Sequence, residues 1–90
     1  MRVAVAIKVR FFARLREQAG TESESVEVKS GSSVSEVYEA LRRRHPSLEP
    51  DLKAVRPAVN QQFSEWDAIV SDGDEVAFIP PVSGGCSGAL

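Results

Sequence analysis

The chain has 90 residues, 42% of them apolar and 27% charged, with a net charge of -2 at pH 7. This length and composition describe one globular domain with a modest core, and they exclude a disordered chain and a membrane-spanning protein. The net charge gives no reason to expect binding to nucleic acid or to an anionic membrane, and it favours a partner with a basic surface.

The cysteine and histidine content limits the chemistry that the chain can carry out alone. One cysteine and one histidine exclude an internal disulfide, a metal site built from cysteine pairs and a histidine-rich zinc site. The apolar start of the chain resembles a signal peptide, but Lys8 and Arg10 interrupt the apolar run too early. We therefore expect a cytoplasmic protein that holds no metal.

The first third of the chain predicts two strands joined by a short helix. Apolar side chains alternate with other residues over 3–11, which is the period of a strand with one buried face. Residues 13–19 are good helix formers, and Gly20 is suited to end that helix. Val26 and Val28 flank a charged residue and predict a second short strand.

The main helix is expected to begin at residues 33–36, where a serine and a glutamate have the spacing of a capping box. Arg42 to Arg44 form its solvated last turn. His45 precedes Pro46, so we expect it to stabilise the helix dipole or to be simply exposed, and not to be a catalytic base. One apolar stripe recurs at helical spacing and comprises Val34, Val37, Tyr38 and Leu41.

The second half of the chain predicts an irregular crossing followed by two strands. Residues 46–57 contain three prolines and are pinned to the core by Leu48, Leu52 and Val55. Residues 58–60 predict a strand and residues 63–70 a tight helical turn rather than a strand. Residues 72–74 predict a turn, after which residues 76–79 alternate as the last strand.

These elements predict an α+β fold of two layers, in which a mixed sheet of four to five strands carries one main helix packed on one face. The first and last strands are the most hydrophobic, so we place them side by side at the centre of the sheet. The ubiquitin-like β-grasp arrangement satisfies this order. Residues 1–82 would form this single domain, and residues 83–90 would form a flexible C-terminal tail.

The most distinctive stretch is Phe78-Ile79-Pro80-Pro81-Val82-Ser83-Gly84-Gly85, which runs from an apolar strand through two prolines into two glycines. The prolines stop the strand and hold the chain extended, and the glycines leave a thin backbone that fits a narrow channel. A pair of glycines alone is more often a mere flexible linker. In this setting we expect Gly85, with Gly84 beside it, to carry the chemistry.

Three segments carry a family resemblance: residues 8–17 (KVRFFARLRE), 58–61 (AVNQ) and 72–85 (DGDEVAFIPPVSGG). Through them the chain resembles the small sulfur carrier subunits of molybdopterin synthase, in the ubiquitin-like ThiS/MoaD superfamily. Such carriers normally end at the second glycine, whereas here Gly85 is joined to a coda, residues 86–90. The resemblance therefore implies that a protease cuts between Gly85 and Cys86. We interpret Cys86 as an exposed thiol that marks this processing site rather than as a nucleophile.

The resemblance also implies how the tail works. An activating enzyme of the ubiquitin-activating type, which uses ATP and Mg, adenylates the freed carboxylate of Gly85, and sulfur from a sulfurtransferase then replaces the adenylate. The resulting thiocarboxylate enters the large subunit of molybdopterin synthase and donates sulfur to the pyranopterin precursor of the molybdenum cofactor. Its sulfur is a potent nucleophile at neutral pH, as thiolates are. The chain itself would bind no cofactor and would not be an enzyme on its own.

Strand parity places Phe12 and Ile79 opposite the core-facing side chains of two neighbouring strands. Two exposed apolar side chains suggest a docking patch, although a loop or the segment around Phe63 would also account for them by covering them. The resemblance favours docking on the large subunit and on the activating enzyme, with Phe63 as a third member. The partner-binding set would continue into the arm through Pro80, Pro81, Val82 and Ser83.

Two further functions stay open. The chain would keep the same fold and glycine pair if it carried sulfur for another pathway, such as thiamine, cysteine or thiolated tRNA synthesis. Alternatively it is a ubiquitin-like interaction module that is never thiolated, for which a permanent tail at residues 86–90 would be the main evidence.

Overall fold

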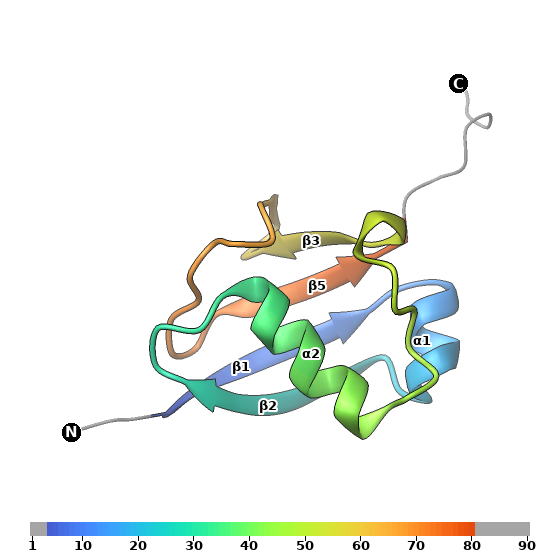
Figure 1. The fold of residues 1–90 in the computed structure, drawn as a ribbon, viewed down its shortest axis with the longest axis horizontal. Helices are drawn as coiled ribbons and strands as arrows, with labels where there is room; N and C mark the ends of the chain where they lie inside the picture. Colours follow the sequence, from blue (N-terminus) through green and yellow to red (C-terminus); the bar gives the residue numbers. More distant parts are fainter. Residues whose placement is uncertain (1–3, 81–90) are drawn as a thin grey trace.

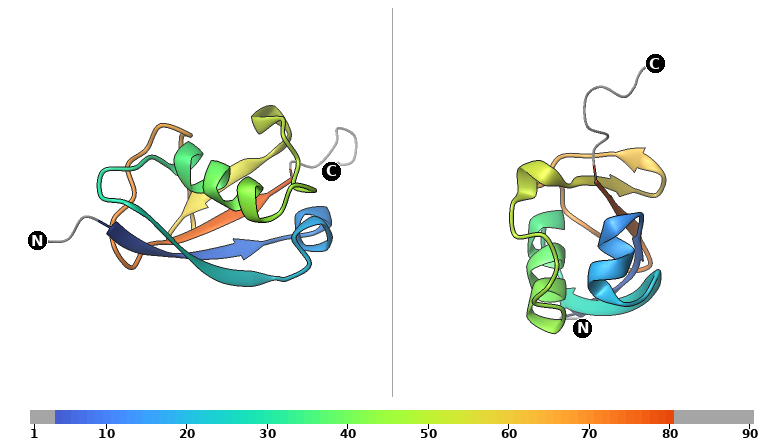
Figure 2. Two further views of the ribbon diagram at one scale, coloured as in Figure 1. Left: turned by 60° about the horizontal axis from the view of Figure 1, so that its bottom comes forward. Right: turned by 90° about the vertical axis from the view of Figure 1, so that its right-hand side faces the viewer.

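The computed structural model describes residues 4–80, which form one five-stranded mixed sheet with a helix packed on one face (Figure 1). The strand order is β2-β1-β5-β3-β4. Figure 2 shows the second layer, formed by α2, on one side of the sheet. The predicted α+β β-grasp fold is confirmed. In chain order the elements are β1 (Ala4–Phe11), α1 (Arg14–Ala19), β2 (Ser23–Lys29), α2 (Val34–Arg44), the 3-10 helix η1 (Leu52–Ala54), β3 (Arg56–Val59), β4 (Gln62–Phe63) and β5 (Glu75–Ile79).

The first and last strands of the sheet lie side by side at its centre, as their hydrophobicity predicted. Strand β1 pairs with β2 in the antiparallel sense and with β5 in the parallel sense. Its side chains alternate between buried and exposed, so one face of the sheet packs under α2 and the other face stays open. At the end of this pairing, Phe11 lies opposite Phe78 and the two rings stack with centroids 6.4 Å apart.

Helix α2 begins at the predicted capping box. The Ser33 hydroxyl accepts a hydrogen bond from the backbone N–H of Glu36, and the Glu36 carboxylate accepts one from the backbone N–H of Ser33 at 2.8 Å. The predicted apolar stripe of the helix is fully buried against the sheet: Val34, Val37, Tyr38 and Leu41. None of the helices in residues 4–80 has the length and apolar character needed to cross a bilayer.

Tyr38 is the largest side chain in the core, and it carries a polar group that the core must satisfy. Its ring packs against Phe78 at 4.8 Å and against Trp66 at 5.6 Å between centroids. Its hydroxyl donates a hydrogen bond to the Glu49 carbonyl at 2.8 Å. Burial, together with the nearby negative charge of Glu49, raises the pKa of Tyr38 to about 12. The phenol therefore stays protonated and keeps donating at neutral pH.

The prediction of a tight helical turn over residues 63–70 is wrong. Asn60 and Gln61 adopt positive φ values of 51° and 73°, which makes them the two-residue turn of a β3–β4 hairpin. The chain after β4 then runs beside the start of α2. The backbone N–H groups of Val34 and Ser35, which a helix cannot satisfy itself, donate to carbonyls of residues 68 and 66 at 2.9 Å. The segment is therefore an irregular connection with one turn, closed by a hydrogen bond from the Ala68 N–H to the Glu65 carbonyl at 3.2 Å, and its carbonyls cap the helix.

The start of one strand also differs from the prediction. Strand β3 begins at Arg56, two residues before the predicted start, and it contains Pro57 as its second residue. The prediction started the strand after Pro57 because proline cannot donate a hydrogen bond in the interior of a β-ladder. Proline is nevertheless tolerated near the start of a strand. In the crossing before it, Leu48 and Val55 are buried as predicted, and Leu52 packs partly buried at the start of η1.

Candidate functional site

The open face of the sheet carries an apolar patch at the end where β5 finishes. Strand β5 ends at Ile79, whose side chain lies on this face and is half-buried. Phe12 follows β1 directly and is 38% exposed, and Phe63 on β4 is 65% exposed. Strand parity predicted Phe12 and Ile79, the family resemblance added Phe63, and the structure brings all three side chains to one place. We call them, with Ala58 and Ala77 between them, the open-face patch.

The centre of the open-face patch is hollow because its two central residues are small. Ala58 on β3 and Ala77 on β5 are direct cross-strand partners, and they form the floor of a depression of about 280 Å³. Larger side chains surround this floor: Arg10, Phe12, Gln61, Phe63, Glu75 and Ile79. A hollow with an apolar floor and aromatic walls is suited to receive an apolar side chain from another protein.

Phe12 is exposed because the chain reverses immediately after it. Its backbone N–H still donates to the Phe78 carbonyl at 3.3 Å, so the residue continues the line of β1 for one more step. Ala13 then adopts a φ of 53°, a left-handed conformation that directs the chain into α1. Both expectations for this residue, a turn and a surface position, are thus correct. No segment among residues 4–80 buries it.

Two arginines stand over the aromatic side chains of the open-face patch. The Arg10 guanidinium lies 5.5 Å from the centroid of the Phe12 ring and 3.6 Å from the Glu75 carboxylate. The Arg56 guanidinium lies 4.6 Å from the centroid of the Phe63 ring. Sequence reasoning missed both arginines as site residues. Their signal was present, since residues 10 and 12 share a strand face, but the stacking of Arg56 depends on the register of the hairpin.

The arm that carries the predicted chemistry begins beside this patch. Pro80 follows Ile79 directly and is half-buried. The remaining predicted arm and tail residues lie outside the described residues: Pro81, Val82, Ser83, Gly84, Gly85 and Cys86. The roles predicted for them stay predictions. Ile79 belongs to the open-face patch, and Pro80 follows it directly in the chain.

The comparison with protein families matches residues 9–85 of the chain to the model of the ThiS family. The chain belongs to the ThiS family. Its match ends at the second glycine of the predicted motif, so residues 86–90 lie beyond the ThiS family domain.

Named relatives of this ThiS family member match over nearly their whole length. The molybdopterin synthase sulfur carrier subunit of Mycobacterium tuberculosis is 38% identical over 82 residues, which cover 90% of this chain and 99% of that protein. The protein of the same name from Escherichia coli is 41% identical, covering 88% of this chain and 99% of that protein. The crystal structure of SAMP1 from Haloferax volcanii is similar with a TM-score of 0.79 at 30% identity, covering 89% of this chain and 99% of that chain.

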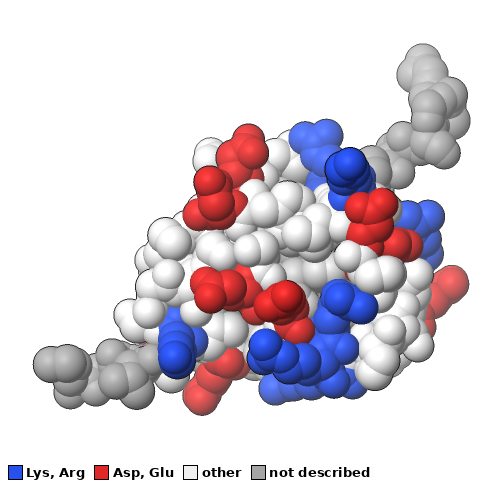
Figure 3. Space-filling model, viewed as in Figure 1, with Lys and Arg blue, Asp and Glu red and all other residues white. Residues whose placement is uncertain are grey.

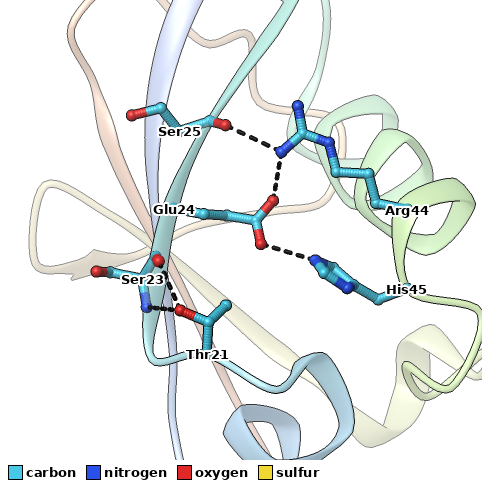
Figure 4. A network of polar contacts seen from close by, with 6 residues as sticks. All are labelled: Thr21, Ser23, Glu24, Ser25, Arg44 and His45. Carbon is cyan, nitrogen blue, oxygen red and sulfur yellow. Dashed lines mark hydrogen bonds and ion pairs between the residues drawn. The ribbon is translucent and has the colours of Figure 1, made fainter.

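A second polar cluster lies away from the open-face patch and joins β2 to the end of α2 (Figure 4). The Glu24 carboxylate accepts hydrogen bonds from Arg44 and from Nε2 of His45, the latter at 2.7 Å. Arg44 also donates to the Ser25 carbonyl at 3.1 Å. The His45 ring packs edge-on against Phe11 with centroids 6.2 Å apart. In this cluster His45 is a half-buried residue that joins the end of α2 to β2, so it is not simply exposed, and its predicted lack of a catalytic role stays a prediction.

On the face that carries α2, the charged side chains of this ThiS family member do not gather into a patch of one sign. Figure 3 shows acidic and basic side chains next to one another there. Within residues 4–80, no group of three or more histidine, cysteine, aspartate and glutamate side chains is placed to hold a metal ion. In this part of the chain, the open-face patch is therefore the feature best suited to a partner.

Proposed function

We propose that this protein is the sulfur carrier subunit of a molybdopterin synthase and that Gly85, once freed, carries the sulfur. The observation that supports this most strongly is the match to two proteins of that name at 38% and 41% identity, each over 99% of its length. The family match through Gly85 adds support, since it includes the glycine pair. The open-face patch supports a role that depends on docking.

The proposed chemistry takes place on the carboxylate of Gly85. A carboxylate oxygen attacks the α-phosphorus of ATP in the activating enzyme, which forms the acyl adenylate and releases pyrophosphate. The outer sulfur of a persulfide on a sulfurtransferase then attacks the acyl carbon and displaces AMP, and a thiol cleaves the resulting acyl disulfide, which releases the thiocarboxylate and leaves the thiol oxidised in a disulfide. The first step is needed because a carboxylate is a poor electrophile until it carries a good leaving group. ATP and Mg would be bound by the activating enzyme, and this chain would supply only the reacting terminus and the docking surface.

The division of labour within the chain follows from its geometry. Strand β5 is paired on both sides, with β1 and with β3, so the base of the arm is held rigidly. The patch would bind the large subunit and would direct the arm toward the pyranopterin precursor bound there. The chain would then act as a sulfur-donating subunit rather than as an enzyme on its own, and we place it in the cytoplasm.

Residues 86–90 require one more step in this scheme, because the amide to Cys86 blocks the Gly85 carboxylate. We expect a protease to remove them. A chain that ends at Gly85 should be adenylated and then gain the mass of one sulfur in place of one oxygen when it is incubated with the activating enzyme, ATP and a sulfur donor. A chain that ends at Gly84 is the matched control. A Gly85-ended chain that is neither adenylated nor thiolated would overturn the sulfur carrier role.

A second candidate function is that of a ubiquitin-like protein that is not thiolated. The blocking tail favours it. The same mass measurement on the full-length chain, made in extract of the source organism, separates the two. Cleavage after Gly85 followed by the exchange of one oxygen for sulfur supports the carrier, whereas a chain that is never thiolated, cleaved or not, supports the second candidate.

A further inference from the structure

Arg56 occupies a particular position at the rim of the open-face patch. It is the first residue of β3, and its cross-strand partner is Ile79, the last residue of β5 before the arm. It shares a strand face with Ala58, which forms the floor of the hollow. The Arg56 side chain is exposed, and its guanidinium lies over the Phe63 ring at 4.6 Å. A cation thus lies on the strand beside Ile79, at the end of the patch where the arm begins.

The charges around the hollow leave this cation unbalanced. Arg10 has its own carboxylate in Glu75, 3.6 Å away, so that pair is neutral. The ion pairs found among residues 4–80 involve Arg10, Arg16, Arg44 and His45, and Arg56 is in none of them. Two arginines against one glutamate leave one positive charge in excess. The net charge of the whole chain is negative and favours a basic partner, whereas the net charge around the hollow is positive.

Stacking on Phe63 makes Arg56 suited to bind a carboxylate. A guanidinium presents its N–H donors in a planar fork, which matches the two oxygens of a carboxylate. Holding that plane against a ring reduces the rotamer freedom lost when an ion pair forms. The aromatic ring also keeps water from one side of the guanidinium, which strengthens an ion pair once a partner covers the other side.

We propose that Arg56 selects the partner of the open-face patch by pairing with an aspartate or glutamate that lies next to the apolar side chain entering the hollow. The inference rests on the proposed function, in which that partner is the large subunit of molybdopterin synthase. The partner surface is then apolar at its centre and acidic on the side nearest the arm.

The test measures the affinity of the large subunit from the same organism for the chain that ends at Gly85. Arg56→Gln should weaken binding by roughly five- to tenfold at low salt, and the difference should shrink as added salt screens the charge. Arg56→Lys keeps the charge but loses the planar fork and the stacking, so it should recover only part of the affinity. Reversing the matching acidic residue of the large subunit to lysine should restore binding to Arg56→Glu.

Two control variants separate this local effect from a change in overall charge. Lys29→Gln removes one positive charge from an exposed residue at the end of β2, on the opposite edge of the sheet. Lys53→Gln removes one positive charge from an exposed residue of η1, which does not line the hollow. Both should change affinity by less than about twofold. Circular dichroism and thermal melting of each variant check that it is folded.

The outcomes distinguish the inference from the proposed function. If Arg56→Gln binds as tightly as the unaltered chain, or no more weakly than Lys29→Gln, the inference is wrong and the sulfur carrier role is untouched. If the unaltered chain ending at Gly85 does not bind the large subunit at all, the proposed partner is wrong, and the inference with it.

Discussion

Replacing Glu24 by glutamine should destabilise the fold at neutral pH, because this carboxylate joins β2 to the end of α2. It accepts charge-assisted hydrogen bonds from Arg44 and His45, and such bonds contribute about 1.5–3 kcal/mol each when they are shielded from water. The Arg44 side chain is 49% exposed, which weakens its share, and it keeps the Ser25 carbonyl as an acceptor. We therefore expect Glu24→Gln to lower the free energy of unfolding by about 1–2 kcal/mol in total.

The pH dependence of this effect has a definite sign. Burial raises the pKa of Glu24, but the hydrogen bonds and charges of His45 and Arg44 outweigh it and hold the pKa below its ordinary value of 4.5. A carboxylate whose folded-state pKa is lowered contributes stability above its unfolded pKa, and this contribution is lost as the pH falls through the folded-state value. The difference between the two proteins should thus be full at neutral pH and shrink below pH 4.5.

Urea denaturation followed by circular dichroism at a series of pH values measures this difference. The matched control is Glu22→Gln. The Glu22 side chain is 73% exposed and forms a long ion pair with Arg16 at 3.9 Å, so loss of its charge should change the free energy of unfolding little. A loss of about 1–2 kcal/mol corresponds to a fall in melting temperature of about 4–16 °C in a domain of this size. The reasoning is refuted if Glu24→Gln matches the unaltered protein at neutral pH, or if the difference persists unchanged in acid.

Three further variants test the core and the patch. Phe12→Ser should weaken binding to the large subunit without unfolding the domain, since Phe12 is 38% exposed; loss of cooperative melting would show instead that the side chain belongs to the core. Tyr38→Phe should lower the free energy of unfolding by about 1 kcal/mol in urea titrations, because the Glu49 carbonyl loses its donor, and an unchanged midpoint would contradict that bond. Gly20→Ala should cost about 1–2 kcal/mol by thermal melting, because Gly20 has a φ of 78°; equal stability would show that the turn relaxes.

The parts of the fold that follow local rules could be predicted from the sequence. The alternation of apolar with other side chains predicted β1, and the capping-box spacing of the serine and glutamate at residues 33–36 predicted the start of α2. The side-by-side placement of β1 and β5 needed one more argument, that the two most hydrophobic strands belong at the centre. The alternation of side chains along each strand also placed Phe12 and Ile79 on the face of the sheet opposite the core, which predicted part of the open-face patch.

The parts that depend on contacts between distant residues could not be predicted. Residues 64–70 have no periodic pattern of their own, and their irregular path follows from the helix N–H groups that their carbonyls satisfy. Glu24 and His45 are 21 residues apart, so nothing near either residue indicates their pairing. The stacking of Arg56 on Phe63 requires the two-residue turn at residues 60 and 61, whose positive φ values are unusual for a glutamine.

The parallel pairing of β1 with β5 also has a consequence for how the protein is made. Strand β5 lies between β1 and β3, so the middle of the sheet is missing until residues 75–79 have left the ribosome. The contacts that close the sheet join the two ends of the domain, which makes folding a late event in synthesis. The arm is translated directly after that strand. Under the proposed function, an activating enzyme that docks on the open-face patch would therefore bind only chains whose sheet is complete.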